Sequence, residues 1–248
     1  KFIDIKCRVA DLRPNCVVIV ASVRALKHHG GVLKEDLSKE NPEALAKGLP
    51  NLLQHVENVT RVYGLPTVVA INRFPTDTEE EISLIREKCN ELSVNVALSE
   101  VWEKGGEGGR ELAEEVVRLC ETESKMNFVY ETDSAILDKI KSIATRVYRA
   151  KDVVLLPNAQ KQMEQLTALG YSKLPVCMAK TQYSFSDDPS LRGTPKDFVV
   201  SIRNLKVSAG AGFIVALTGD IMTLPGLPKV PAAESIDVDS KGKITGLF

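Results

Sequence analysis

Short apolar runs alternate with longer amphipathic segments along this chain. Four runs rich in β-branched residues predict interior strands at 16–22, 67–73, 94–100 and 152–157. Four segments of helical period lie at 41–64, 76–92, 109–123 and 132–150. This alternation predicts an α/β fold in which a mainly parallel sheet has helices on both faces.

Two of the predicted helices begin with recognisable capping residues. Asn41 can cap a helix whose first position is Pro42, with an expected interruption at Pro50. Thr78 is followed three residues later by Glu81, which together form a capping box. Both helix starts are therefore predicted with their first residue.

The texture of the chain changes towards its carboxyl terminus. A strand is predicted at 175–180, then a polar, turn-rich stretch at 180–197, and two further strands at 198–208 and 213–222 that flank the sequence AGAG. IDVD and KITGLF predict a terminal hairpin across Ser240 to Gly242. We place a domain boundary near residue 124, which gives an α/β region at 1–124 and a smaller carboxyl-terminal α/β domain at 125–248.

Composition limits the classes of protein. The 248 residues are 44% hydrophobic with a net charge of -1, so bulk charge does not draw the chain to nucleic acid or to a membrane. No apolar stretch approaches the roughly 18 to 20 residues that span a bilayer. Five widely spaced cysteines without a CxxC pair favour a reduced, cytoplasmic protein over a disulfide framework. The chain begins with Lys1, and we expect it to be a piece of a longer protein.

Residues that directly follow parallel strands are the first candidates for a site, because ligands bind beyond the carboxyl ends of such strands. The first such stretch, VRALKHHGG at 23–31, reads as a loop. Arg24 and Lys27 are candidates for binding an anion, and Gly30 and Gly31 permit a close approach of backbone. A solvated basic turn is an equally good reading.

Aromatic residues mark the next two strand ends. Phe74 lies between a strand end and a helix cap, where it can stack on a flat ring or act as a hydrophobic staple. Trp102 stands beside the glycines of residues 105–109. Because Glu107 would repel a phosphate, this stretch favours a flat ring lying close to backbone over a phosphate cradle.

The chain lacks the sequence motifs that several kinds of catalysis and nucleotide binding require. The chain has no GxxxxGK[ST] loop, no GxSxG turn and no GxGxxG motif, which removes a phosphate-binding loop, a hydrolase elbow and a dinucleotide-dependent dehydrogenase. His28 and His29 are chain neighbours that point in different directions, so a shared metal ion is not expected. Cys177 lies in an apolar strand and reads as a structural thiol.

Six stretches, taken together and in this order, resemble the carboxyl-terminal half of formate–tetrahydrofolate ligases, and the resemblance runs to Phe248. They are VASVRALKHHGG, AINRFPTDTEEE, VWEKGGEGG, AKTQYSFSDDP, SAGAGF and LTGDIMTLPGLPK. The tail TGDIMTLPGLPKVPAAE is more similar to the bacterial single-function enzymes.

The resemblance implies an ATP-dependent ligase that joins formate to tetrahydrofolate through formyl phosphate, giving 10-formyltetrahydrofolate, ADP and phosphate. It also implies magnesium, a monovalent cation such as potassium, a homotetramer, and an amino-terminal half that carries the phosphate-binding loop. Neither nucleic acid nor membrane is an expected partner. The alternative is a non-catalytic binding or oligomerisation module derived from the same fold.

The same resemblance assigns roles to residues. Phe74 and Trp102 match the pair that sandwiches the folate ring, with Pro75 and Leu98 beside them. The residues themselves, apart from the resemblance, suggest two further sets. Asn72, Glu100 and Glu103 are candidates for hydrogen bonds to the edge of that ring. The polar side chains of residues 180–186 are candidates for the nucleotide side, for which a plain polar loop is the alternative: Lys180, Thr181, Gln182, Ser184 and Ser186.

Overall fold

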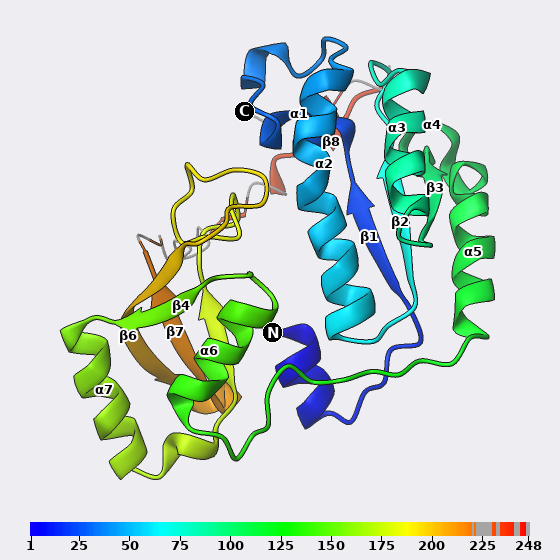
Figure 1. Cartoon of the computed structure of the whole chain (residues 1–248). Coiled ribbons are helices and arrows are strands. Elements are labelled where there is room, and N and C mark those ends of the chain that lie inside the picture. The colour runs from blue at the N-terminus through cyan, green and yellow to red at the C-terminus, as the bar shows by residue number, and fades with distance from the viewer. Residues whose placement is uncertain (220, 222–229, 232–233, 241–243, 247–248) are drawn as a thin grey trace.

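The computed structural model describes residues 1–219, 221, 230–231, 234–240 and 244–246. Two sheets lie beside each other (Figure 1). The first holds β1 (Val17–Ala21), β2 (Thr67–Asn72) and β3 (Asn95–Ser99) in the order β1-β2-β3. All three strands are parallel, as predicted.

Helices cover both faces of this first sheet. Helices α1 (Val23–His29), α2 (Pro42–Glu57) and α3 (Glu79–Asn90) share one buried core with the strands. On the other face, α5 (Arg110–Cys120) packs Leu119 against Val68 and Ala97. The predicted α/β class with helices on both faces is confirmed.

Three of the four strands predicted to be interior lie at sheet edges: β1 and β3 in this sheet, and the strand predicted at 152–157 in the second sheet. In β1, Val18 and Val20 are 37% and 70% exposed. Alternate residues of a strand face opposite sides. One face of the strand is therefore half-buried to buried, with Val17, Ile19 and Ala21, and the other is largely open.

The stretch 23–31, expected to be a loop, is mostly helix. The side chain of Ser22 caps α1 by accepting a 3.3 Å hydrogen bond from the backbone N–H of Ala25. Arginine, alanine, leucine and lysine after such a cap are good helix formers. The two glycines that suggested a loop, Gly30 and Gly31, come only after the last residue of this helix.

Helix α2 continues through Pro50, where an interruption was expected. Proline removes one backbone hydrogen bond, but the helix is held by buried Leu45, Leu49 and Leu52. Its predicted start is confirmed, because Asn41 Oδ1 accepts a 2.9 Å hydrogen bond from the N–H of Ala44. A π-helical turn, η3 (Asn58–Val62), follows it.

The predicted capping box of α3 is also present. The N–H of Glu81 donates to Thr78 Oγ1, and the N–H of Thr78 donates to the Glu81 carboxylate, both over 3.3 Å. Short helical turns complete this part of the chain: η2 (Lys34–Asp36), α4 (Val101–Lys104) and η4 (Gly105–Gly109).

The second sheet is mixed. Strands β4 (Asp152–Leu155), β5 (Val176–Ala179), β6 (Val199–Ser208) and β7 (Phe213–Thr218) have the order β4-β6-β7-β5. The outer strands β4 and β5 run parallel to their neighbours, whereas β6 and β7 are antiparallel. Only the short turn η6 (Ala209–Ala211) joins β6 to β7, and a connection this short allows only an antiparallel pair.

Helices α6 (Ile136–Arg146) and α7 (Pro157–Ala168) pack on the second sheet, and η5 (Tyr171–Lys173) leads into β5. The predicted terminal hairpin is confirmed by β8 (Asp237–Val238), which pairs antiparallel with β9 (Ile244–Thr245). Residues 241–243 between them, and residues 220 and 222 of the strand predicted at 213–222, lie outside the described residues.

Each sheet has its own core, one drawn from residues 21–94 and the other from 129–216. The π-helical turn η1 (Phe2–Cys7) joins the second core, where Asp4 accepts hydrogen bonds from the N–H of Val129 and the hydroxyl of Tyr63. The domain boundary near residue 124 stays a prediction. Within the described residues, no helix is both long and apolar enough to cross a membrane.

Candidate functional site

The two predicted aromatic residues follow the carboxyl-terminal ends of β2 and β3, at the same end of the first sheet. Asn72 and Ser99 are register partners, and the chain then leaves the sheet towards Phe74 and Trp102. The indole N–H of Trp102 donates a 2.9 Å hydrogen bond to the carbonyl oxygen of Arg73, the residue before Phe74. The structure therefore links the two loops that carry the pair.

The loop around Phe74 is held by a tight turn. The backbone N–H of Phe74 donates a 2.9 Å hydrogen bond to Asp77 Oδ2, and the backbone N–H of Asp77 donates a 2.9 Å hydrogen bond to the Phe74 carbonyl oxygen. Burial raises the pKa of Asp77, and the hydrogen bond from Phe74 offsets part of that rise. This turn fixes the direction in which the Phe74 ring projects.

Arg24 lies on the Phe74 ring. Its guanidinium carbon is 4.4 Å from the ring centroid, and Nη2 donates a 3.3 Å hydrogen bond to Thr76 Oγ1. Such cation–π contacts contribute about 0.5–2 kcal/mol. The predicted anion candidate is thus placed beside the predicted ring-binding residue.

Lys27 does not meet its expectation as an anion-binding residue. Its ammonium is buried 2.9 Å from the carboxylate of Glu81 and donates a 2.7 Å hydrogen bond to the Lys39 carbonyl. The physical reason is that residues 23–29 form a helix packed against α2, so position 27 points into the core. Arg24 and Lys27 therefore do not act together on a ligand.

The other residues around the aromatic pair differ in exposure. Trp102 is 58% exposed, Pro75 is exposed and Leu98 is half-buried against the core. Among the ring-edge candidates, Glu100 is bonded to Lys104 and Arg73, and the bond from Lys104 is the main cause of its lowered pKa. Glu103 is exposed.

Two adjoining cavities connect Phe74 to the nucleotide-side candidates. The first, about 330 Å³, is lined by Phe74 and Asn72. The second, about 290 Å³, is lined by Lys180, Thr181, Gln182 and Ser184. Three residues line both cavities: His29, Asn51 and His55. Phe74, Asn72 and four of the five nucleotide-side candidates thus line two adjoining cavities, whereas Trp102 and Arg24 line neither.

The nucleotide-side candidates fall into two groups. Lys180, Thr181, Gln182 and Ser184 line the second cavity, whereas Ser186 does not. The hydroxyl of Ser184 donates to the Leu191 carbonyl, and Ser186 Oγ accepts from the N–H of Asp188 over 3.2 Å. These two buried serines hold the loop together.

Of the residues shared by the two cavities, Asn51 and His55 were missed by sequence reasoning, and His29 was considered there only as a metal ligand. Asn51 Nδ2 donates a 3.0 Å hydrogen bond to the carbonyl of Gly193, and the N–H of Gly193 donates to His29 Nδ1 over 3.2 Å. Asn51 and His55 are four apart on α2, hence on the same face of that helix. That spacing was the available signal.

Comparison with known protein families bears on the same residues. A family model described as Formate--tetrahydrofolate ligase matches residues 1–248. The chain belongs to the formate–tetrahydrofolate ligase family. The family resemblance drawn from the six motifs is therefore confirmed, and with it the ligase class with formate, ATP and tetrahydrofolate as the family's substrates.

Magnesium, expected for a ligase of this family, has no assigned residues here. No group of three or more His, Cys, Asp or Glu side chains among the described residues could hold a metal ion. His28 Nδ1 lies 3.0 Å from the Val32 carbonyl, while His29 turns towards Gly193. We therefore derive no step through a metal at these residues.

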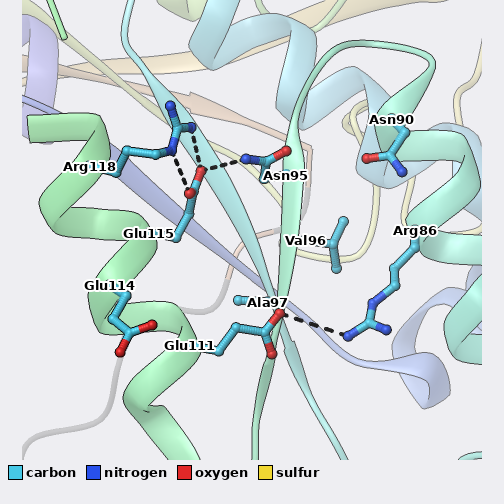
Figure 2. Close-up of a pocket in the computed structure, with 9 residues that line it drawn as sticks. All are labelled: Arg86, Asn90, Asn95, Val96, Ala97, Glu111, Glu114, Glu115 and Arg118. Carbon is cyan, nitrogen blue, oxygen red and sulfur yellow. Dashed lines mark hydrogen bonds and ion pairs between the residues drawn. The ribbon is translucent and has the colours of Figure 1, made fainter.

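A further hollow of about 400 Å³ lies at the outer edge of β3, between α3 and α5 (Figure 2). Its charges are paired with one another: Glu115 accepts hydrogen bonds from Arg118 and Asn95, and Glu111 lies 3.9 Å from Arg86. Glu111 also accepts a 3.4 Å hydrogen bond from the N–H of Leu98. In this member of the ligase family, the hollow reads as polar cover for an edge strand.

Proposed function

We propose that this chain forms the tetrahydrofolate-binding part of an ATP-dependent formate–tetrahydrofolate ligase. One observation supports this above the others: Phe74 and Trp102 follow neighbouring parallel strands, and the Trp102 indole is bonded to the residue before Phe74. A flat ring stacked on an aromatic side chain gains about 1–3 kcal/mol. Pro75 and Leu98 flank the ring, and Asn72, Glu100 and Glu103 contact its edge.

The reaction proposed has two bond exchanges. A formate oxygen attacks the terminal phosphorus of ATP, ADP leaves, and formyl phosphate forms. The folate nitrogen then attacks the formyl carbon and gives up its proton to solvent, and the C–O bond to phosphate breaks as phosphate leaves with its electron pair. Arg24 supplies positive charge beside the ring for an anionic group of the folate or of a phosphate. The nucleotide approaches from the side of Lys180, Thr181 and Gln182.

The sequence lacks the GxxxxGK[ST] loop that grips nucleotide phosphates. We therefore propose that an amino-terminal half supplies this grip, and that the 248-residue chain binds folate weakly without turnover. We also propose that the ligase is a cytoplasmic homotetramer and that it uses magnesium and a monovalent cation such as potassium.

Fluorescence titration of the chain with tetrahydrofolate tests the ring site, because Trp102 is the only tryptophan. We expect saturable quenching that weakens about tenfold in Phe74→Ala, a loss of about 1.4 kcal/mol. Tyr171→Ala is the matched control, since it removes an exposed aromatic ring in the turn η5, which precedes β5. Its affinity should equal that of the unaltered chain.

Equal affinity of Phe74→Ala and the unaltered chain contradicts the ring site. If millimolar folate gives no quenching, the titration is repeated with the amino-terminal half of a family member added. Quenching that then appears supports a site completed by both halves. Continued absence favours the non-catalytic binding or oligomerisation module.

A further inference from the structure

The second cavity is lined by basic and neutral polar side chains. It lies between α2, residues 147–148 and the loop that follows β5, and its volume is about 290 Å³. His29, His55 and Lys180 all line it. No aspartate or glutamate is found among the described residues that line it. These basic groups therefore have no carboxylate partner among the lining residues.

These basic groups keep hydrogen-bond donors that are not used. Because His29 Nδ1 accepts from the N–H of Gly193, a neutral His29 carries its proton on Nε2 and can donate. Lys180 Nζ donates to the carbonyl oxygens of Thr181 and Ser184, which leaves one of its three N–H donors. The cavity therefore offers donors to a ligand rich in acceptor oxygens.

His55 lies between the other two basic groups. Its ring packs 4.6 Å from the ring of Phe185, and its nitrogens take part in no hydrogen bond of the described residues. Burial lowers the pKa of His55, and the charges of His29 and Lys180 lower it further. The residue is nonetheless exposed to solvent, and it lines the cavity.

The pKa of Lys180 is lowered to about 8, mainly by burial. Asp187, the nearby carboxylate, offsets this only in part and already accepts hydrogen bonds from Ser186 and Ser201. A bound anion would supply the missing counter-charge and raise the pKa of Lys180 and His55. Anion binding should then take up protons.

Asn58 adds to the cavity a hydrogen-bond acceptor that needs a donor, whereas the basic groups offer unused donors. Its Nδ2 donates a 2.9 Å hydrogen bond to the Val147 carbonyl, which fixes Oδ1 as the acceptor. Oδ1 is buried and has no partner among the described residues, and Asn58 lines this cavity. A buried acceptor without a donor costs about 1–3 kcal/mol. A ligand with an O–H group would satisfy it.

We propose that this cavity binds a phosphate that retains an O–H, held by Lys180, His55 and His29, with Asn58 Oδ1 accepting from the O–H. The ligand is inorganic phosphate, whose hydrogen phosphate form keeps one O–H at about pH 7.5, whereas the terminal phosphate of a nucleotide is ionised at that pH and keeps none. The inference shares Lys180 with the nucleotide side proposed above, but it rests on the cavity and needs neither turnover nor folate binding.

Isothermal titration of the 248-residue chain with inorganic phosphate tests the site at about pH 7.5, in two buffers of different ionisation enthalpy. We expect saturable binding with net proton uptake. Sulfate, which has no O–H at this pH, should bind at least fivefold more weakly because Asn58 then stays unsatisfied. These three measurements need no variant.

Variants assign the binding to the cavity. We expect His55→Phe, which keeps a ring against Phe185, and Lys180→Met each to weaken phosphate binding tenfold or more. Lys196→Met, which removes an exposed lysine of the same loop, should bind phosphate as the unaltered chain does. Circular dichroism checks that each variant is folded. If Lys180→Met does not fold, His55→Phe and the proton uptake still decide.

Three results overturn the proposal: no saturable phosphate binding, binding without proton uptake, or affinity unchanged in folded His55→Phe. ADP, whose terminal phosphate has no O–H at this pH, should compete only weakly, as sulfate does. The fluorescence titration with Trp102 tests only the folate site, and the phosphate titration tests only the second cavity. Either proposal can therefore fail while the other stands.

Discussion

His29 Nδ1 accepts a 3.2 Å hydrogen bond from the backbone N–H of Gly193, 164 residues along the chain. The carbonyl of the same glycine is held by Asn51. Two helices of the first sheet thereby grip the loop between β5 and β6, which Figure 1 shows in yellow reaching from the second sheet towards α2. The geometry of the two cavities depends on this grip.

The hydrogen bond from Gly193 to His29 should weaken in acid, and the free energy of unfolding should fall with it. Burial, followed by the charges of His28 and Arg192, lowers the pKa of His29 below its ordinary value of 6.5. Below that value the unfolded chain takes up the proton first, so the free energy of unfolding should fall as pH drops from 7.5 to 5.5. Urea unfolding across this range measures the fall.

His29→Gln isolates the contribution of this residue, because an amide oxygen can still accept from Gly193 but does not titrate in this range. We expect the variant to flatten the pH dependence, with a remainder due to His55, whose pKa is also lowered. His28→Gln is the matched control. An unaltered pH dependence in His29→Gln would show that protonation of His29 is not linked to unfolding.

The buried pair of Lys27 and Glu81 should be sensitive to removal of one partner. Lys27→Met leaves the Glu81 carboxylate buried with only the N–H groups of Asn41 and Thr78, which should cost about 3–5 kcal/mol of unfolding free energy. Lys47→Met, which removes an exposed lysine paired with Glu43, should change stability little. Guanidinium denaturation of both variants tests this, and equal losses would argue against the assignment.

Glu81 also predicts an acid transition. Burial alone would raise its pKa, but hydrogen bonds from Asn41, Lys27 and Thr78 outweigh burial and lower it below 4.5. Its contribution to stability is therefore complete above pH 4.5 and lost as pH falls through the lowered value. In Glu81→Gln the stability between pH 5 and pH 3 should fall less steeply. The same slope in both proteins would contradict this linkage.

Helices α1 and α2 meet through a glycine. A Cβ at Gly48 would lie 1.8 Å from the carbonyl oxygen of Leu26, so Gly48→Ala must push the helices apart. Overpacking of this kind costs about 1–3 kcal/mol or more, despite the higher helix propensity of alanine. Gly210→Ala is the control, because its Cβ would meet open space. Thermal unfolding should separate the two, and a Gly48→Ala variant as stable as the unaltered chain would refute the close approach.

Cys16 and Cys120 should form a disulfide under mild peroxide. Their Sγ atoms are 3.7 Å apart, Cys120 is exposed, and burial raises the pKa of Cys16. Oxidation should begin at Cys120, giving a sulfenic acid and water, after which the Cys16 thiol displaces a second water. Mass spectrometry should find the loss of two hydrogens in a peptide pair holding both residues.

The bridge would close a loop across 104 positions and stabilise the fold by about 2–4 kcal/mol. Cys120→Ser should abolish both the mass change and the rise in melting temperature. If peroxide instead links Cys177 or forms only intermolecular dimers, the pairing is wrong.

Much of the fold followed from the sequence because its signals are local. The apolar runs of β1, β2 and β3, the cap at Asn41 and the box at Thr78 and Glu81 each depend on residues close together in the chain. Position after a strand likewise predicted that Phe74 and Trp102 would lie at one sheet edge. Six motifs together indicated the ligase family, which the family model confirmed.

Tertiary structure alone decided the chemistry of the basic residues. Nothing near Lys27 in the sequence shows that Glu81, 54 residues away, neutralises it in the core. Likewise, His29, His55 and Lys180 meet only because the second sheet presents its loop to α2. The sequence by itself determined the family, the strands and most of the helices, but not α1, which was expected to be a loop. The fate of each charge depended on burial and on partners distant in the chain, because desolvation and pairing are properties of the folded surroundings.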